Sequence, residues 1–258
     1  MTFEPSRVPA TAADTAPANT DPMPADTAPR RIVVVNGGTS VPSSSRRLAD
    51  RIAQKTLDRL AARDIEATVA IIDLGPLAGE IASAIVTGHP QGDLLTAIQT
   101  LAAADGVVVT TPVYKAGMSG LLKSFVDVLD NDLLIATPIA LGATAGTSRH
   151  ALVIDDQLRP LFAFMRALPV PTSVFAAPED WGDASLGSRI DRTAAELAAL
   201  VASSVRSAIT DQSWDSYQHT WGGNARPGSS PLEIDFNTDL MRLATGGSSR
   251  AGRGIGTA

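Results

Sequence analysis

Continuous apolar runs alternate with segments of helical periodicity along the central part of the chain. The runs consist of Val, Ile, Leu and Ala without a polar residue at every second position, which is typical of strands buried on both faces. They predict strands at 31–36, 65–74, 106–112, 138–145 and 170–177. Apolar residues three or four positions apart predict helices at 44–63, 92–104, 119–130, 150–168 and 186–210.

This alternation predicts an α/β fold. We expect a three-layer sandwich with a five-stranded parallel sheet in the flavodoxin-like order 2-1-3-4-5, formed by residues 30–221. Residues 1–29 lack the apolar content to pack and are expected to form a disordered leader. Residues 222–258 are expected to be a mostly flexible tail, in which 232–244 can dock as a short helix.

Composition excludes several kinds of chemistry. The 258 residues include no cysteine, so disulfides and thiol catalysis are excluded, and the three histidines are too dispersed to predict a metal site. The net charge of −6 argues against nucleic acid as a partner. No apolar run reaches the roughly 18–20 residues that cross a bilayer, and no secretory signal precedes the first strand. We therefore expect a cytoplasmic protein without a membrane partner.

The loop between the first strand and the first helix reads GGTSVPSSS and has no carboxylate and no lysine. In an open parallel sheet the ligand lies beyond the carboxyl ends of the strands, and a helix N-terminus there attracts anions. The hydroxyls and glycines therefore predict a phosphate site. A simple serine-capped helix is the structural alternative. The candidate phosphate-binding residues are Gly38, Thr39, Ser40, Ser43, Ser44 and Ser45.

The type of phosphate follows from what this loop lacks. A loop for nucleoside triphosphates would need GxxxxGK[ST], and a dinucleotide loop would need GxGxxG, and neither motif is present. A neutral loop rich in hydroxyls suits a terminal phosphate monoester such as that of FMN.

The loop after the third strand, within 110–127, contains Pro112, Gly117 and Gly120, which suit an irregular turn facing a flat ligand. Here the sequence resembles the NADPH-dependent FMN reductases, flavodoxin-like enzymes that supply reduced flavin to two-component monooxygenases. The first loop also resembles that family's phosphate loop, with Gly38 in place of its first serine. The resemblance covers about 31–177 and points to an actinobacterial branch. The second motif, T-P-x-Y-K/H-x-x-x-S-G-x-L-K, matches Thr111, Pro112, Tyr114, Lys115, Ser119, Gly120, Leu122 and Lys123.

The resemblance implies FMN and either NADPH or NADH as cofactors, with hydride passing from the nicotinamide to the flavin. The cofactors supply this chemistry, so we expect no catalytic side chain and no metal. It also implies a flavin-dependent monooxygenase as a possible partner. Helix faces rich in Ala and Leu predict a homodimer or homotetramer. The residues expected along the flavin ring are Thr111, Pro112, Val113, Tyr114, Lys115, Ala145, Gly146 and Thr147.

Two other functions remain open from the sequence. A quinone or azo reductase with tightly bound FMN would share the fold and the hydride step and differ in the final acceptor. A non-catalytic flavodoxin-type carrier would share the phosphate loop, but such carriers flank the flavin with aromatic residues, and this chain has three tryptophans and two tyrosines. His150, at the start of a predicted helix, is not expected to be catalytic. Phe162, Phe164 and Met165 are expected in the core or in a subunit interface.

Overall fold

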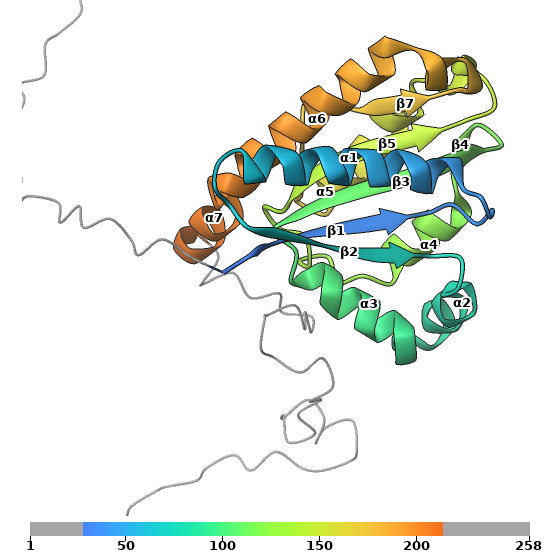
Figure 1. Cartoon of the computed structure of the whole chain (residues 1–258). Coiled ribbons are helices and arrows are strands. Elements are labelled where there is room, and N and C mark those ends of the chain that lie inside the picture. Colours follow the sequence, from blue (N-terminus) through green and yellow to red (C-terminus); the bar gives the residue numbers. More distant parts are fainter. Residues whose placement is uncertain (1–27, 214–258) are drawn as a thin grey trace, which may run out of the picture.

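The computed structural model describes residues 28–213 (Figure 1). The predicted leader, apart from its last two residues, and the predicted tail with its docked helix lie outside these residues. The strands are β1 (Arg30–Asn36), β2 (Ala67–Asp73), β3 (Gly106–Tyr114), β4 (Gly117–Met118), β5 (Pro138–Thr144), β6 (Leu168–Pro169) and β7 (Val174–Ala176). The α-helices are α1 (Ser44–Ala61), α2 (Ala78–Thr87), α3 (Gly92–Ala102), α4 (Gly120–Asp127), α5 (Arg159–Phe164), α6 (Ala184–Ala202) and α7 (Val205–Ser213).

The strands form one sheet in the order β2-β1-β3-β5-β6, and β7 pairs with the far end of β5. All pairings are parallel except that of β4, which turns back antiparallel onto β3. The predicted order 2-1-3-4-5 is therefore confirmed, with β6 and β7 sharing the fifth position. Because β1, β3 and β5 are neighbours, the loops that follow their carboxyl ends meet at one edge of the sheet.

Helices cover both faces of this sheet, as the three layers in Figure 1 show. On one face α1 and α6 pack over one apolar core, and on the other α2, α3, α4 and α5 pack over a second. Alternate residues of β1 separate the two cores, since Ile32 and Val34 belong to one and Val33 and Val35 to the other. No helix within residues 28–213 is long and apolar enough to cross a membrane.

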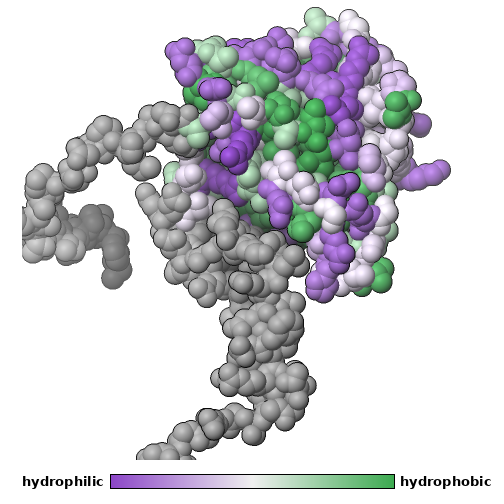
Figure 2. All heavy atoms as spheres, turned by 60° about the horizontal axis from the view of Figure 1, so that its bottom comes forward, coloured by the Kyte–Doolittle hydropathy of each residue, from purple (hydrophilic) through white to green (hydrophobic). Residues whose placement is uncertain are grey.

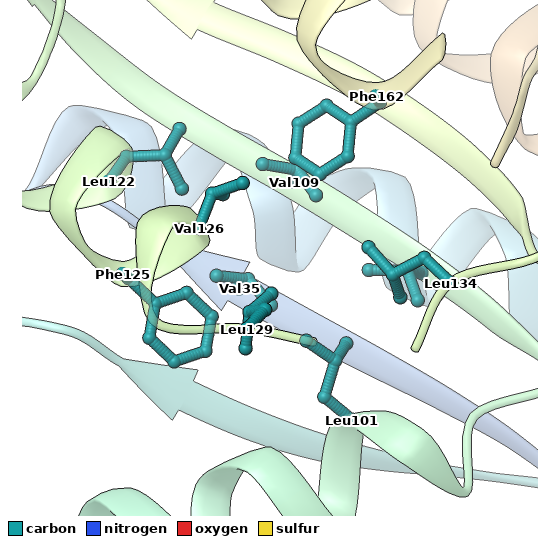
Figure 3. A pocket seen from close by; sticks show the side chains of 10 residues that line it. Val35, Leu101, Val109, Leu122, Phe125, Val126, Leu129, Leu134 and Phe162 are labelled. Atoms are coloured by element: carbon teal, nitrogen blue, oxygen red, sulfur yellow. The ribbon is translucent and has the colours of Figure 1, made fainter. Parts of the chain in front are cut away.

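The core between β1, β3 and α4 contains a small cavity of about 10 Å³, enough for at most one water molecule (Figure 3). The side chains around it are all apolar, so it offers a polar ligand no partner. It is a packing defect and not a ligand site. Its lining residues are Val35, Leu101, Val107, Val109, Leu122, Phe125, Val126, Leu129, Leu134 and Phe162.

Three helical expectations need correction. No helix was predicted where α2 lies. The helix predicted for 150–168 is instead a 3₁₀ turn (Ser148–His150), a π-helical turn (Ile154–Leu158) and the short α5. The helix predicted for 186–210 is interrupted between α6 and α7, where Ser204 has a positive φ of 51°. The aromatic group near 162–165 is divided, since Phe162 is buried and Phe164 is exposed.

Candidate functional site

The first and second predicted loops are hydrogen-bonded to each other at the carboxyl edge of the sheet. The Gly37 N–H donates to the Thr110 carbonyl at 2.8 Å, and the Ser119 hydroxyl donates to the Gly37 carbonyl at 3.0 Å. Ser119 also caps α4 by accepting the Leu122 N–H at 3.2 Å. One hydroxyl therefore fixes the position of the α4 N-terminus relative to the candidate phosphate loop.

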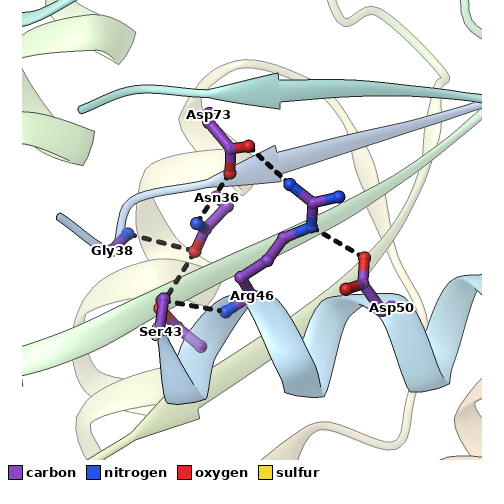
Figure 4. A network of polar contacts seen from close by, with 7 residues as sticks. Asn36, Gly38, Ser43, Arg46, Asp50 and Asp73 are labelled. Atoms are coloured by element: carbon purple, nitrogen blue, oxygen red, sulfur yellow. Dashed lines mark hydrogen bonds and ion pairs between the residues drawn. The ribbon is translucent and has the colours of Figure 1, made fainter. Parts of the chain in front are cut away.

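Asn36, the last residue of β1, organises the first loop (Figure 4). Its side chain is 2% exposed, and its Oδ1 accepts the Gly38 N–H at 3.1 Å and the Ser45 hydroxyl at 2.9 Å. Its Nδ2 donates to Asp73 Oδ1, at the end of β2, at 2.9 Å. Asn36 is not among the site residues predicted from the sequence. The available signal was a single amide at the end of an otherwise apolar strand, directly before the glycines.

The hydroxyls of the first loop fall into two groups. Ser43 is the N-cap of α1, accepting the Arg46 N–H at 3.2 Å, and it shares a hydrogen bond of 3.0 Å with the buried Ser45. The serine-cap alternative thus describes Ser43. The second group consists of Thr39, Ser40 and Ser44. Their hydroxyls are exposed and form no side-chain hydrogen bond within residues 28–213.

Gly38 allows this loop to close tightly over the start of α1. A Cβ atom there would lie far inside van der Waals contact with the Oγ atoms of Ser43 and Ser45. A glycine at this position therefore leaves room for these two serine side chains to point inward. The phosphate loop that this chain resembles has a serine at the same position.

Arg46 neutralises acidic groups beside the loop. Its guanidinium forms ion pairs with Asp50, one helical turn away, and with Asp73. Partial burial alone would lower the pKa of Arg46, but its hydrogen bonds and charge interactions with the two carboxylates raise the pKa above its ordinary value. Asp73 is thus paired with a permanent cation, which lowers the net negative charge beside the first loop.

The second loop presents some predicted residues and buries others. Thr111 is fully buried, and its hydroxyl accepts the Ser119 N–H at 2.9 Å and donates to the Pro112 carbonyl at 3.0 Å. Its hydroxyl therefore shapes the loop from inside. Pro112 and Val113 are half-buried, whereas Tyr114 is 49% exposed and Lys115 is exposed at the turn.

The third loop begins where Ala145 donates its N–H to the Ala176 carbonyl of β7 at 3.2 Å. Ala145 and Thr147 are half-buried and Gly146 is exposed, and Thr147 accepts the Arg149 N–H at 3.4 Å. The structure thus brings the third loop to the same edge as the other two, next to β3 through the β3–β5 pairing.

Two further features of this edge were not expected. The hydroxyl of Thr110 is buried and forms no hydrogen bond within the described residues, although it lies beside Asn36 in the β1–β3 pairing. The guanidinium of Arg47, in the first turn of α1, stacks 4.8 Å from the ring centre of Trp181. This contact joins α1 to the loop after β7.

The sequence model of the NADPH-dependent FMN reductases matches residues 30–182, which include all three loops. The chain belongs to this family. It is 38% identical over 175 residues to an NADH-dependent FMN reductase, SfnE, of Pseudomonas putida, a match covering 66% of this chain and 91% of that protein. It is 33% identical over 173 residues to an FMN reductase (NADPH) of Pseudomonas aeruginosa, covering 67% of this chain and 90% of that protein.

Among solved structures, an oxidoreductase from Corynebacterium diphtheriae is 43% identical and superimposes with a TM-score of 0.66. That match covers 68% of this chain and 98% of the other. The expected flavodoxin-like fold and enzyme class are both confirmed. The chain is an NAD(P)H:flavin oxidoreductase, and FMN and a reduced nicotinamide are the substrates of its family.

Proposed function

We propose that FMN lies across the carboxyl edge of the sheet, with its phosphate in the first loop. The exposed hydroxyls of Thr39, Ser40 and Ser44 and the N–H groups of the first two residues of α1 are the donors that would hold it. The observation that supports this best is that these hydroxyls are exposed and form no side-chain hydrogen bond in the part of the chain that the structure describes, while Ser43, Ser45 and Asn36 fix the loop beneath them.

The donor set suits a phosphate dianion. The loop has no carboxylate, Asp73 is paired with Arg46, and the N-terminus of the 18-residue α1 adds a favourable dipole. Each charge-assisted hydrogen bond contributes about 1.5–3 kcal/mol. Two or three such bonds would account for a large preference for FMN over unphosphorylated riboflavin.

The ring would then lie against the second and third loops. Tyr114 and Lys115 are exposed on the β3–β4 hairpin, and Gly146 leaves its backbone open to close approach. FMN, when bound, supplies the acceptor for the hydride. The residues of this chain bind the ring, orient it for the nicotinamide and offer N–H groups toward its polar edge.

We further propose that reduced FMN leaves the enzyme for a flavin-dependent monooxygenase. The protein would act in the cytoplasm. It would also belong to the actinobacterial branch of the family. The 43% identity with the Corynebacterium diphtheriae structure supports the branch. FMN is on this account a substrate that is released. A quinone or azo reductase would retain it.

We also propose a homodimer or homotetramer. Figure 2, in which the α2 and α3 side of the molecule comes forward, shows a hydrophobic area bordered by hydrophilic side chains. Exposed apolar side chains include Val86 of α2, which is 86% exposed, and Phe164 of α5, which is 69% exposed. Light scattering at micromolar concentration tests this proposal, and a monomer would contradict it.

The binding proposal is tested by steady-state oxidation of NADH and NADPH with increasing FMN. The double substitution Thr39→Val and Ser44→Ala should raise the KM for FMN about 100-fold or more, because two charge-assisted bonds are lost, and leave kcat nearly unchanged. Ser83→Ala, an exposed serine on α2, is the matched control. A KM for FMN equal to that of the control would contradict the phosphate assignment.

The acceptor is tested separately with the unmodified protein. Gel filtration should separate the protein from FMN, and free FMN should be reduced faster than menadione or an azo dye. Retained FMN together with faster reduction of menadione would favour a quinone reductase instead.

A further inference from the structure

The hairpin formed by β3 and β4 ends in a turn that its own sequence does not favour. Tyr114 pairs with Gly117, so Lys115 and Ala116 form a two-residue turn, and both have positive φ, 50° and 66°. This is the type I′ geometry, which normally selects Asn-Gly because residues with a Cβ are strained there. The ladder is also short, because β4 has only two residues. Something outside the hairpin must stabilise this shape.

Gln157, on the π-helical turn, binds the outer edge of β4 with both ends of its amide. Its Oε1 accepts the Met118 N–H at 3.0 Å, and its Nε2 donates to the Ala116 carbonyl at 3.2 Å. The N–H and carbonyl of Gly117 face β3, so the carbonyl of Ala116 and the N–H of Met118 point away from the sheet. The amide therefore takes the place of a further strand along this edge.

The π-helical turn explains how this side chain reaches the hairpin. Val153, Ile154 and Leu158 of the same segment are buried in the core, while Gln157 is half-buried on the side of β4. A π-helical turn is wider than an α-helical one, and such turns occur often at functional sites. Here it lets the segment keep its apolar contacts and still direct an amide at the hairpin.

We propose that Gln157 is a positioning residue for flavin reduction, holding the hairpin in the shape that presents Tyr114 and Lys115. This rests on the proposed function, in which those two residues contact the flavin ring. The base of the hairpin is already fixed by the bond between Thr111 and Ser119. Gln157 fixes its tip, so the pose of the residues between them depends on this one amide.

The test compares Gln157→Met, which keeps the length and removes both hydrogen bonds, with the unmodified protein. We expect the KM for FMN to rise about tenfold, since two neutral hydrogen bonds are lost, with little change in the melting temperature. Hydrogen exchange at the Met118 amide, measured without FMN, should become about tenfold faster. Gln54→Met is the control, because Gln54 on α1 is exposed and its side chain donates to Asp58 on the same helix.

A second substitution tests whether the loss of FMN affinity in Gln157→Met comes from strain in the hairpin turn. Adding Ala116→Gly to Gln157→Met removes the strain at the left-handed position and should restore most of the affinity for FMN. An unchanged KM in Gln157→Met, or no recovery on adding Ala116→Gly, would overturn the positioning role. Failure of the unmodified protein to oxidise NADH or NADPH with FMN would instead overturn the proposed function, so the two failures are distinguishable.

Discussion

Asn36→Asp replaces the buried amide NH2 of the side chain with a carboxylate oxygen and leaves the shape of the side chain nearly unchanged. The Asn36 amide donates to Asp73 at 2.9 Å, and after substitution two carboxylates would face each other across that distance. The lost bond to a charged group costs about 1.5–3 kcal/mol. For two unit charges at 2.9 Å, Coulomb repulsion in a medium of dielectric 20 is about 6 kcal/mol, so the pair would bind a proton instead of ionising fully.

We therefore expect Asn36→Asp to lower the free energy of unfolding by about 2–4 kcal/mol at neutral pH. The new carboxyl has a folded-state pKa raised above its unfolded value, so its destabilising effect is largest above the folded pKa and shrinks as the pH falls through it. Urea unfolding at pH 7.5 and pH 5.5 measures both effects. FMN affinity should fall as well, because the hydrogen bond that ties Asn36, and with it the first loop, to Asp73 is lost.

Asn131→Asp is the matched control, because it makes the same chemical change at an exposed position in a turn. If the two variants lose equal stability, or if the loss in Asn36→Asp does not depend on pH, the role assigned to Asn36 is wrong.

Three further predictions concern single residues. Gly38→Ala should displace Ser45 and cost about 1–3 kcal/mol of stability in urea unfolding, with weaker FMN binding; stability equal to the unmodified protein would show that the loop is not tightly closed. Phe125→Ala should enlarge the apolar cavity and cost about 3–5 kcal/mol, measured in the same way, and a loss below 1 kcal/mol would contradict the packing described. The N–H of Ser185 lowers the pKa of Asp183, the N-cap of α6, so Asp183→Ala should lower the melting temperature more at pH 7 than at pH 3. An equal decrease at both values would refute this cap.

The sheet was predictable from the sequence because its strands are buried on both faces. Alternate residues of the run Ile32–Val35 pack into the two cores, so both faces of the strand must be apolar. The result is a continuous apolar run, which is typical of a strand buried on both faces. The predicted order 2-1-3-4-5 is the flavodoxin-like order that five strands alternating with five helices fit.

The missed helix α2 has a physical explanation. Only Ile81 and Ala84 are buried among its residues, while Ile85 and Val86 are exposed. Its apolar positions therefore do not mark a single buried face, and periodicity does not reveal it.

The loops were located correctly, but the roles of individual residues depend on side-chain orientation. Ser44 and Ser45 are adjacent and chemically identical, yet one is exposed and the other is buried against Asn36. Likewise, nothing in the sequence connects Gln157 with Met118, 39 positions away, because the contact depends on a π-helical turn. Such long-range polar contacts are set by tertiary structure and leave no local pattern.

In the proposed function, the first loop holds the phosphate of FMN. The most direct measurement is the ratio of the dissociation constants of riboflavin and FMN for the unmodified protein, by fluorescence titration in one buffer. The two flavins share the ring and differ in the phosphate. Two charge-assisted hydrogen bonds predict that FMN binds about 100-fold or more tightly. Equal affinity for riboflavin and FMN would contradict the account.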